Sequence, residues 1–322
     1  MRLNRLVLPL YLLPLAFNES CSAKPTVHIL NQDLVFHVID TGQGSSALVE
    51  LPDNKLFLID SGYDTTKTRQ FFNGLSNRQI DYFLTTHGDQ DHINNGKWIY
   101  ENFEVKYSFL PRLYSNSLNV KDKYNVQPIQ LNSTKTYTEF LTSATKDNNW
   151  EYTDGHDFDK FKTSNEYTID ILEENIYPTS NQNDYSPIII FSYRGKSICI
   201  SGDATSVKEN AIVQNFELPK CEAYVIGHHG SNSSSSANFL KKIAPNYSFY
   251  SSGDVNGTKY GLPNLQALQR IKPYSGTNIY GTEFCGNISF RISHETGKLV
   301  LDESYEKTTT AWNGKGGERL AI

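Results

Sequence analysis

Cysteine is scarce in this sequence, and its spacing forms neither a zinc knuckle nor a redox pair. The four cysteines are Cys21, Cys199, Cys221 and Cys285. After Cys21 an odd number remains, so at least one thiol stays unpaired even where disulfides are permitted. Cys199 lies in the apolar stretch KSICIS and is expected to be a small core residue. The sequence therefore predicts no cysteine-based metal or redox centre.

The chain also lacks an excess of positive charge. It has 30 lysines and arginines against 35 aspartates and glutamates, so its formal net charge is -5. Such a chain has no general attraction for polyphosphates, and nucleic-acid binding would need a local basic patch. Its 322 residues are enough for one large α/β domain or two smaller ones with a substantial core. Nucleic acid is thus a partner that the charge does not favour, and the oligomeric state stays open.

The chain has no apolar run long enough to span a bilayer. The run near its start, Leu6–Phe17, is too short, follows two arginines and precedes small polar residues. This order is typical of a secretory signal peptide, here over residues 1–23. Two prolines inside the run argue against a buried first helix. We expect an exported protein that is periplasmic, secreted or lipid-anchored to the envelope, and both lipidation of Cys21 and simple cleavage near Ala23 stay open.

The pattern from residue 34 onward predicts a meander of strands. LVFHVID, SALVEL and NKLFLID are strand-like, and PDN forms the turn between the last two. A helix is expected at about 64–77, and the strand DYFLTT then runs into THGDQDH. This cluster of histidines and aspartates therefore lies at the carboxyl end of a strand.

A second half with sheet and helix follows a polar, tyrosine-rich stretch. Residues 112–180 are weakly periodic and are predicted to be an insert and connecting loops. PIIIFSY and KSICIS then predict a hairpin at Arg194 and Gly195, a helix follows at about 205–216, and EAYVIG leads into the histidine pair 228–229. Strands and helices alternate to about residue 301. We expect an α/β fold, one αββα sandwich of two mixed sheets flanked by helices over 30–304, and a loosely ordered tail at 305–322.

Side chains able to bind metal stand at three separate strand ends. They are His87, Asp89, Asp91 and His92 after the first strand, Asp203 after the second, and His228 and His229 after the third. Zinc and similar ions take imidazole nitrogen and carboxylate oxygen, and two neighbouring ions need a bridging carboxylate, for which Asp203 is suitably placed. Each motif alone is a common turn or solvated loop. The same context three times favours a metal site.

These motifs, in this order, resemble the metallo-β-lactamase superfamily and, within it, the extracytoplasmic hydrolase domain of the ComEC competence proteins and its stand-alone relatives. HVIDTGQGSSALVELPDNKLFLIDSG is similar to the opening of that branch, THGDQDH to its HxDxDH loop, ISGDA to its bridging-aspartate strand and GHHGS to its later histidine motif. The resemblance covers residues 34 to about 300 and implies the metallo-β-lactamase αββα sandwich.

The resemblance implies a role for each side chain of the motifs. The implied metal ligands are His87, Asp89, Asp91, His92, Asp203 and His228. Asp203 would bridge two divalent ions, one held by residues 87 and 89 and the other by residues 91 and 92. Asp60 would orient the histidine loop through a hydrogen bond, and Gln43 would line the mouth of the site. Asp91 and His229 are the expected catalytic residues, and His229, if free of metal, would donate a proton to the leaving group.

Two positions depart from the pattern of this branch. YGLP places Leu262 where the branch has a histidine that completes the second metal site, and leucine cannot bind a metal ion. Ser45 stands where an aspartate is usual. The second ion is therefore expected to be held more weakly, to use water, or to recruit the other member of the pair at 228–229.

The motifs together predict an exported metal-dependent hydrolase that uses metal-activated water on ester bonds. The resemblance favours phosphodiesters, in DNA strands or in a small or polymeric phosphorylated envelope component. Oxygen-rich ligands suit zinc and also manganese. The alternative is a non-catalytic metal-binding envelope protein on the same fold, which the leucine at 262 would explain. A β-lactamase or thioester hydrolase is not favoured, because Asp89 takes the place of a histidine.

Overall fold

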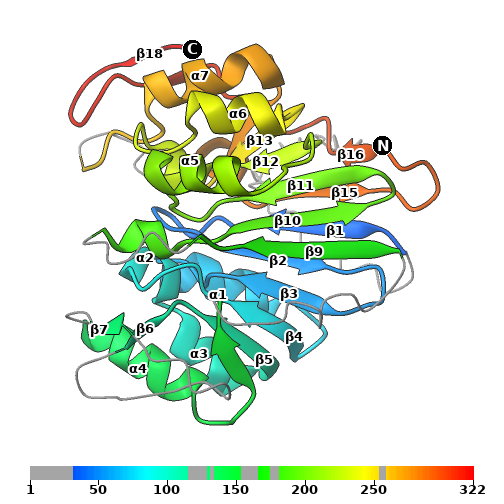
Figure 1. The fold of residues 1–322 in the computed structure, drawn as a ribbon, viewed down its shortest axis with the longest axis vertical. Helices are drawn as coiled ribbons and strands as arrows, with labels where there is room; N and C mark the ends of the chain where they lie inside the picture. The colour runs from blue at the N-terminus through cyan, green and yellow to red at the C-terminus, as the bar shows by residue number, and fades with distance from the viewer. Residues whose placement is uncertain (1–31, 115–128, 131–133, 154–165, 175–180, 254–258) are drawn as a thin grey trace, which may run out of the picture.

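Two β-sheets lie face to face, and helices cover the outer face of each sheet (Figure 1). The computed structural model describes residues 32–114, 129–130, 134–153, 166–174, 181–253 and 259–322. This layering confirms the expected αββα sandwich of two mixed sheets. The predicted signal peptide at 1–23, with Cys21, lies outside the described residues. Within them, no helix is both long and apolar enough to cross a membrane.

The first sheet has eight strands and contains the predicted meander. Its spatial order is β16 (Leu299–Leu301), β15 (Ile288–Ile292), β1 (Leu34–Val38), β2 (Ala47–Glu50), β3 (Leu56–Ile59), β4 (Gln79–Leu84), β5 (Glu104–Leu110) and β8 (Trp150–Tyr152). β1, β2 and β3 pair antiparallel, as the meander predicts. β3, β4, β5 and β8 are parallel neighbours, so these four end at the same edge of the sheet.

The second sheet has six strands. Its order is β14 (Ile279–Gly281), β13 (Tyr247–Tyr250), β12 (Ala223–Val225), β11 (Lys196–Ile200), β10 (Ile188–Tyr193) and β9 (Tyr167–Leu172). β11 to β14 are parallel neighbours. β10 and β11 form the predicted hairpin, whose turn residues Arg194 and Gly195 have φ of 50° and 74°. A two-residue turn between twisted strands requires such positive values.

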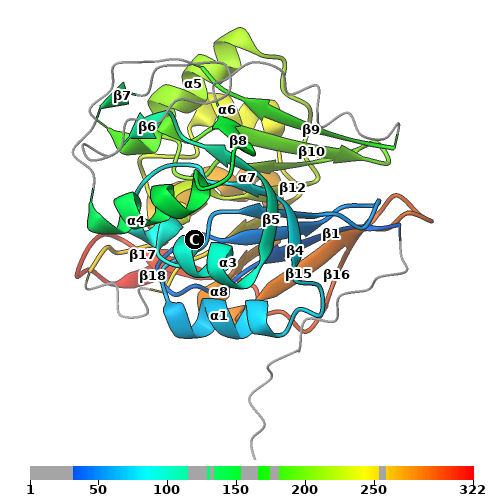
Figure 2. The ribbon, with the colours of Figure 1, turned by 90° about the horizontal axis from the view of Figure 1, so that it is seen from below.

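Helices follow the parallel strands and pack on the outer faces. α1 (Thr65–Asn73), α2 (Gln90–Ile93), α3 (Gly96–Asn102) and α4 (Lys135–Ala144) belong to the first sheet, and α5 (Ser206–Asn215), α6 (Ala237–Ile243) and α7 (Leu265–Ser275) to the second. Three short helical segments lie between other elements: η2 (Gln182–Tyr185) precedes β10, η3 (Gly227–Gly230) follows β12, and α8 (Thr282–Cys285) lies between β14 and β15. Figure 2 shows α1 on one outer face and α5 and α6 on the other. α1 begins where the side chain of Asp64 accepts from the N–H groups of Thr66 and Lys67, a normal helix cap.

Phenylalanines from both sheets form the core between them. Phe36 of β1 meets Phe191 of β10 edge to face, with ring centroids 5.2 Å apart, and Phe57 of β3 meets the same ring at 5.4 Å. Phe290 of β15 stacks on Phe36 at 5.3 Å and on Phe249 of β13 at 4.3 Å. All five rings are nearly or completely buried. Burial of each ring contributes about 1.5–3 kcal/mol to the stability of the fold, so this core holds the two sheets together.

The stretch at 112–180, predicted as insert and connecting loops, contains regular structure where it is described, and that part of the prediction is wrong. β6 (Leu113–Tyr114) pairs with β7 (Ile129–Gln130), β8 and β9 each form the edge strand of a main sheet, and α4 packs on the first sheet. α4 buries Tyr137, Phe140, Leu141 and Ala144, which have helical spacing. Threonines between these residues weaken the pattern in the sequence.

The C-terminal residues form a hairpin, which corrects the expectation of a loosely ordered tail. β17 (Thr310–Trp312) pairs with β18 (Arg319–Ala321). Ala311 is fully buried against the outer core of the second sheet, and Arg319 makes two hydrogen bonds of 2.9 Å to Glu283. Three-residue strands have too few positions to show a period, so the sequence does not reveal them.

Replacing Phe191 by Ala should lower the free energy of unfolding by about 3–5 kcal/mol, because the ring fills the centre of the core between the sheets. Urea unfolding followed by circular dichroism measures the loss. Phe284→Ala is the matched control: this ring is 39% exposed, and its removal should cost less than about 1 kcal/mol. Equal losses in the two variants would contradict the proposed position of the core.

Candidate metal centre

Strands of both sheets deliver polar loops to one place. The loop with residues 87–92 follows β4, Asp203 follows β11, and the pair at 228–229 follows β12. Asp60 follows β3, and Ser251 follows β13. β3 and β4 are parallel, as are β11, β12 and β13, so each sheet presents these loops at one edge. Ligand sites of parallel sheets form outside such carboxyl ends.

Asp203 lies among four imidazoles. Its Oδ1 is 3.2 Å from Nε2 of His92, and its Oδ2 is 3.6, 3.7 and 3.9 Å from Nε2 of His228, His229 and His87. The carboxylate is almost fully buried, as are three of the four rings. One aspartate therefore faces histidines from loops of both sheets.

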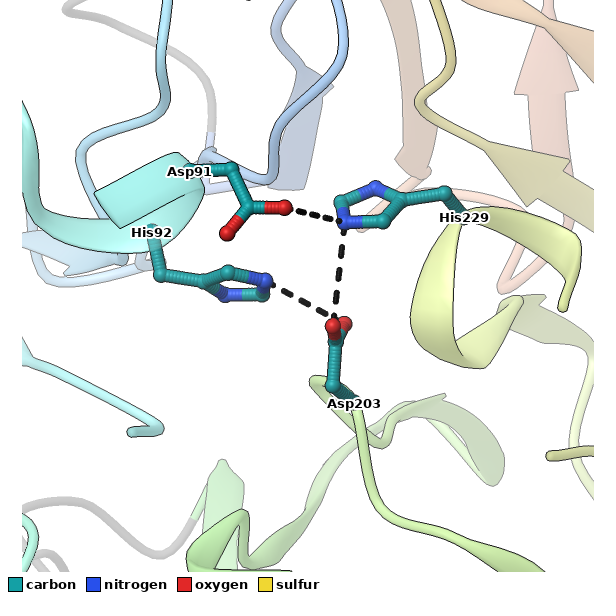
Figure 3. Close-up of side chains that lie close together, drawn as sticks. All are labelled: Asp91, His92, Asp203 and His229. Carbon is teal, nitrogen blue, oxygen red and sulfur yellow. Dashed lines mark ion pairs between the residues drawn. The ribbon is translucent and has the colours of Figure 1, made fainter. Parts of the chain in front are cut away.

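Four of the predicted residues form a compact group. Asp91, His92, Asp203 and His229 offer ligand atoms that all lie within 4.8 Å of one another. Figure 3 shows Asp91 and His92 reaching in from one side, and Asp203 and His229 from segments of the second half. Oδ2 of Asp91 is 3.3 Å from Nε2 of His229. His229, expected to be a proton donor, thus stands inside this group.

The other predicted ligands adjoin Asp203 and form a second, overlapping set. Nε2 of His87 is 3.5 Å from Oδ2 of Asp89, and both His87 and His228 approach the same Asp203 oxygen. The side chains of Asp89 and Asp91 are 45% and 33% exposed, whereas His87 is completely buried. The site is therefore open to solvent on its aspartate side.

The four imidazoles are held by their other ring nitrogen. The Nδ1 partners are Thr86 Oγ1 for His87 at 3.1 Å, Asp60 Oδ2 for His92 at 2.7 Å, Ser233 Oγ for His228 at 2.9 Å and the Ser251 carbonyl for His229 at 3.0 Å. Each Nε2 is thereby directed toward Asp203. Metal-binding histidines are oriented in this way in proteins generally.

Several buried atoms at the centre have no hydrogen-bond partner among the residues that the structure describes. They are Nε2 of His87, His92 and His229, and Oδ1 of Asp203. Such an atom costs about 1–3 kcal/mol when nothing satisfies it. Lone pairs of imidazole nitrogen and carboxylate oxygen that converge on one point fit a divalent cation, so the donor set suits a metal ion.

Asp60 anchors the histidine loop. Its carboxylate accepts from Nδ1 of His92 at 2.7 Å and from both the N–H and the hydroxyl of Thr86 at 2.8 Å. When Nε2 of His87 faces a cation, its Nδ1 carries the proton and donates to the Thr86 hydroxyl. Asp60 therefore orients one imidazole directly and a second through Thr86.

The backbone at the site adopts strained conformations. Asp60, His228 and His229 have φ of 56°, 52° and 55°, in the left-handed region. For residues other than glycine this costs on the order of 1–3 kcal/mol, and it occurs mainly at functional sites. Gly202 also has a positive φ of 49°, and a Cβ on it would lie 2.9 Å from the side chain of Thr86. The loop before Asp203 therefore requires glycine at this position.

The charges of the group compensate one another. Burial alone would raise the pKa of the Asp203 carboxyl, but the facing imidazoles outweigh it and hold that pKa well below its usual value. Burial alone would lower the pKa of His92 and of His229, but their carboxylate neighbours raise both. Burial dominates at His228 and lowers its pKa. The carboxylate stays ionised, as a metal ligand must be.

Three further residues singled out in the sequence, which belong to neither ligand set, lie in the loops around the centre. Gln43 accepts hydrogen bonds from the loop after β13, including one of 3.2 Å from Ser252. The carbonyl of Leu262 accepts from the same hydroxyl at 3.0 Å. Ser45 lines a cavity next to the centre, and its N–H donates to the carbonyl of Asp91 at 3.0 Å. These contacts brace the loops around the centre.

Sequence reasoning missed the residues that position the ligands. Thr86 directly precedes His87, so a hydroxyl beside the motif was an available signal. Ser186 accepts from the N–H of Asp203 at 3.1 Å, and its hydroxyl lies 3.4 Å from Nδ1 of His87. Neither Ser186 nor Ser251 lies near a motif along the chain, and the sequence offers no signal for them.

Comparisons with known proteins agree with this geometry. The family model described as the metallo-beta-lactamase superfamily matches residues 39–254. ComE operon protein 3 of Bacillus subtilis is 22% identical over 293 residues, which cover 84% of this chain and 34% of that protein. Competence protein ComA of Neisseria gonorrhoeae is 26% identical over 263 residues, covering 79% of this chain and 32% of that protein. The chain thus spans about a third of the length of these relatives.

Among solved structures, the metallo-beta-lactamase fold protein YhfI from Bacillus subtilis is similar. The two superpose with a TM-score of 0.48 at 10% sequence identity, and the match covers 80% of this chain and 100% of YhfI.

Replacing Thr86 by Val should weaken Zn²⁺ binding by about 10- to 100-fold, because valine keeps the shape but removes the hydroxyl between Asp60 and His87. Competition with a chromophoric chelator measures the affinity. Thr142→Val is the control, since its hydroxyl donates to a carbonyl on the exposed side of α4. If both variants bind zinc as the wild type does, Thr86 has no positioning role.

Proposed function

The chain belongs to the metallo-beta-lactamase superfamily, which has a metal-dependent hydrolase fold, and we propose that it cleaves phosphodiester bonds with divalent cations held around Asp203. The observation that carries this proposal is the convergence of four imidazole Nε2 atoms on one buried carboxylate.

Two overlapping ligand sets support two ions. One set is Asp91, His92, Asp203 and His229, and the other is His87, Asp89, Asp203 and His228. Asp203 belongs to both sets and has two oxygens to share between them. In this assignment both histidines of the pair are ligands. His229 then compensates for the missing histidine at Leu262 and is not free to act as a proton donor.

The chain's own residues hold and orient the reacting groups. When bound at this place, a divalent cation would supply water of lowered pKa and would polarise the ester. Buried imidazoles exclude bulk solvent from the inner side of the centre, and their Nδ1 partners keep the rings from turning. Asp91 is partly exposed, but it belongs to the compact group and its imidazole neighbours hold the pKa of its carboxyl below the usual value, so we assign it as a ligand and not as a proton acceptor.

Phosphodiesters fit the ligand chemistry best. Asp89, Asp91 and Asp203 supply hard oxygen donors beside the imidazoles, a mixture that suits zinc and also manganese. The resemblance of the motifs to the ComEC branch implies the same class of substrate. A net charge of -5 disfavours long nucleic acids, so we favour a short phosphoester or a phosphorylated envelope polymer.

We also propose that the protein is exported, because residues 1–23 have the pattern of a signal peptide. The mature protein, isolated from the cells that make it, should lack this leader. Mass spectrometry of its N-terminus separates the two open cases, acylation at Cys21 and cleavage near Ala23. A full-length N-terminus on the mature protein would refute export by this route.

Replacing Asp203 by Asn should reduce phosphodiester turnover by more than about 100-fold. Loss of a residue that only supports a metal ligand already lowers activity by up to about 100-fold, and Asp203 is proposed to be a ligand itself. The measurement is kcat/KM on bis-(p-nitrophenyl) phosphate, together with the zinc and manganese content of the purified protein.

The matched control is Asp53→Asn, which changes an exposed aspartate paired with Lys55 in the turn between β2 and β3. It should leave both turnover and metal content unchanged. Full turnover by the Asp203 variant would contradict the assignment. Wild-type protein that binds metal but turns over no ester would favour the alternative, a non-catalytic metal-binding protein, which Leu262 supports.

A further inference from the structure

Two exposed tyrosines and a lysine meet on the surface. Tyr63 and Tyr260 are 40% and 46% exposed, and they are two of the seven large hydrophobic side chains exposed in the described part of the chain. Nζ of Lys259 lies 4.7 Å from the ring centroid of Tyr260 and 5.9 Å from that of Tyr63. We call these three residues the Lys259 cluster.

Contacts of Tyr63 place this cluster beside the metal centre. Asn94, which follows α2, donates to the carbonyl of Tyr63 at 2.8 Å. Gly44 lies between Tyr63 and Asp91, where there is no room for a side chain. A Cβ on Gly44 would lie 2.8 Å from N of Tyr63 and 2.5 Å from the carbonyl oxygen of Asp91. The cluster therefore adjoins the aspartate side of the centre, where solvent enters.

Lys259 is an exposed cation at this place. Its pKa is raised, first by a hydrogen bond with Tyr260 and further by the nearby carboxylate of Asp91. The chain after it is anchored at Gly261, where a Cβ would lie 2.4 Å from the backbone of Gly314 in the C-terminal hairpin. The hairpin thus helps to hold the lysine where it faces both rings.

On the premise of the proposed hydrolase, we propose that the Lys259 cluster is a substrate subsite for an anionic phosphoester with a flat organic group, such as a nucleotide. The ammonium contacts phosphate oxygens, and an exposed tyrosine face stacks on the base. Aromatic faces also attract quaternary ammonium groups. Here Lys259 already presents a cation to both rings, so the subsite rejects choline esters by repulsion of like charges.

The test is equilibrium binding to the metal-loaded protein, measured by titration calorimetry with thymidine 5′-monophosphate and with phosphocholine. Lys259→Ala should raise the Kd of the nucleotide about fivefold, and 1 M salt should abolish this difference. The Kd of phosphocholine should stay the same or fall. Lys298→Ala, at an exposed lysine between β15 and β16, should match the wild type with both ligands.

A second variant tests the aromatic part. Tyr63→Leu should weaken the binding of thymidine 5′-monophosphate but not of inorganic phosphate, because it removes a stacking face and no charge. Three results would overturn the subsite. Lys259→Ala could weaken the binding of thymidine 5′-monophosphate and phosphocholine equally, it could affect neither ligand, or the wild type could bind neither ligand. These monoesters report binding without turnover. Lysine-dependent nucleotide binding by a protein inactive on every ester would refute the hydrolase and leave the subsite standing.

Discussion

The site depends on the burial of one carboxylate. Asp203 is removed from water, and an uncompensated charge there would cost several kcal/mol. Four imidazoles therefore face it, and each is turned by a partner at its other nitrogen. Those partners come from loops of both sheets, so the strands of both sheets have to end on the same side. The layered architecture meets this requirement, because parallel strands in each sheet deliver their loops to one edge.

Stability and function are located in different parts of the molecule. The edge of the sandwich lowers the stability of the folded state. It contains left-handed backbone at Asp60, His228 and His229 and buried atoms that lack hydrogen-bond partners. The phenylalanines between the sheets offset this cost away from the reacting groups. Such a division is common in enzymes, where strain is retained because the surrounding packing leaves no other conformation.

Much of the fold and the ligand-bearing segments could be predicted because the signals are local. The meander, the hairpin at Arg194 and Gly195, and the clusters after β4, β11 and β12 each lie within a few consecutive residues. Contacts between distant segments left no such signal. Ser251 meets His229, and Ser186 meets His87, only through tertiary packing. The helix α4 was missed because β-branched threonines stand between its buried residues along the sequence, and the C-terminal hairpin was missed because its strands are too short to show a period.

The compact group draws equally on the two halves of the chain. Asp91 and His92 come from the first half, and Asp203 and His229 from the second. A nascent chain that ends before β9 lacks the whole second sheet and also β15 and β16 of the first, so it offers an incomplete coordination shell and leaves one sheet face uncovered. Tight binding of a cation must wait until the second sheet has packed against the first, because ligands from loops of both sheets are needed. Metal occupancy in this architecture therefore reports that the two sheets have come together.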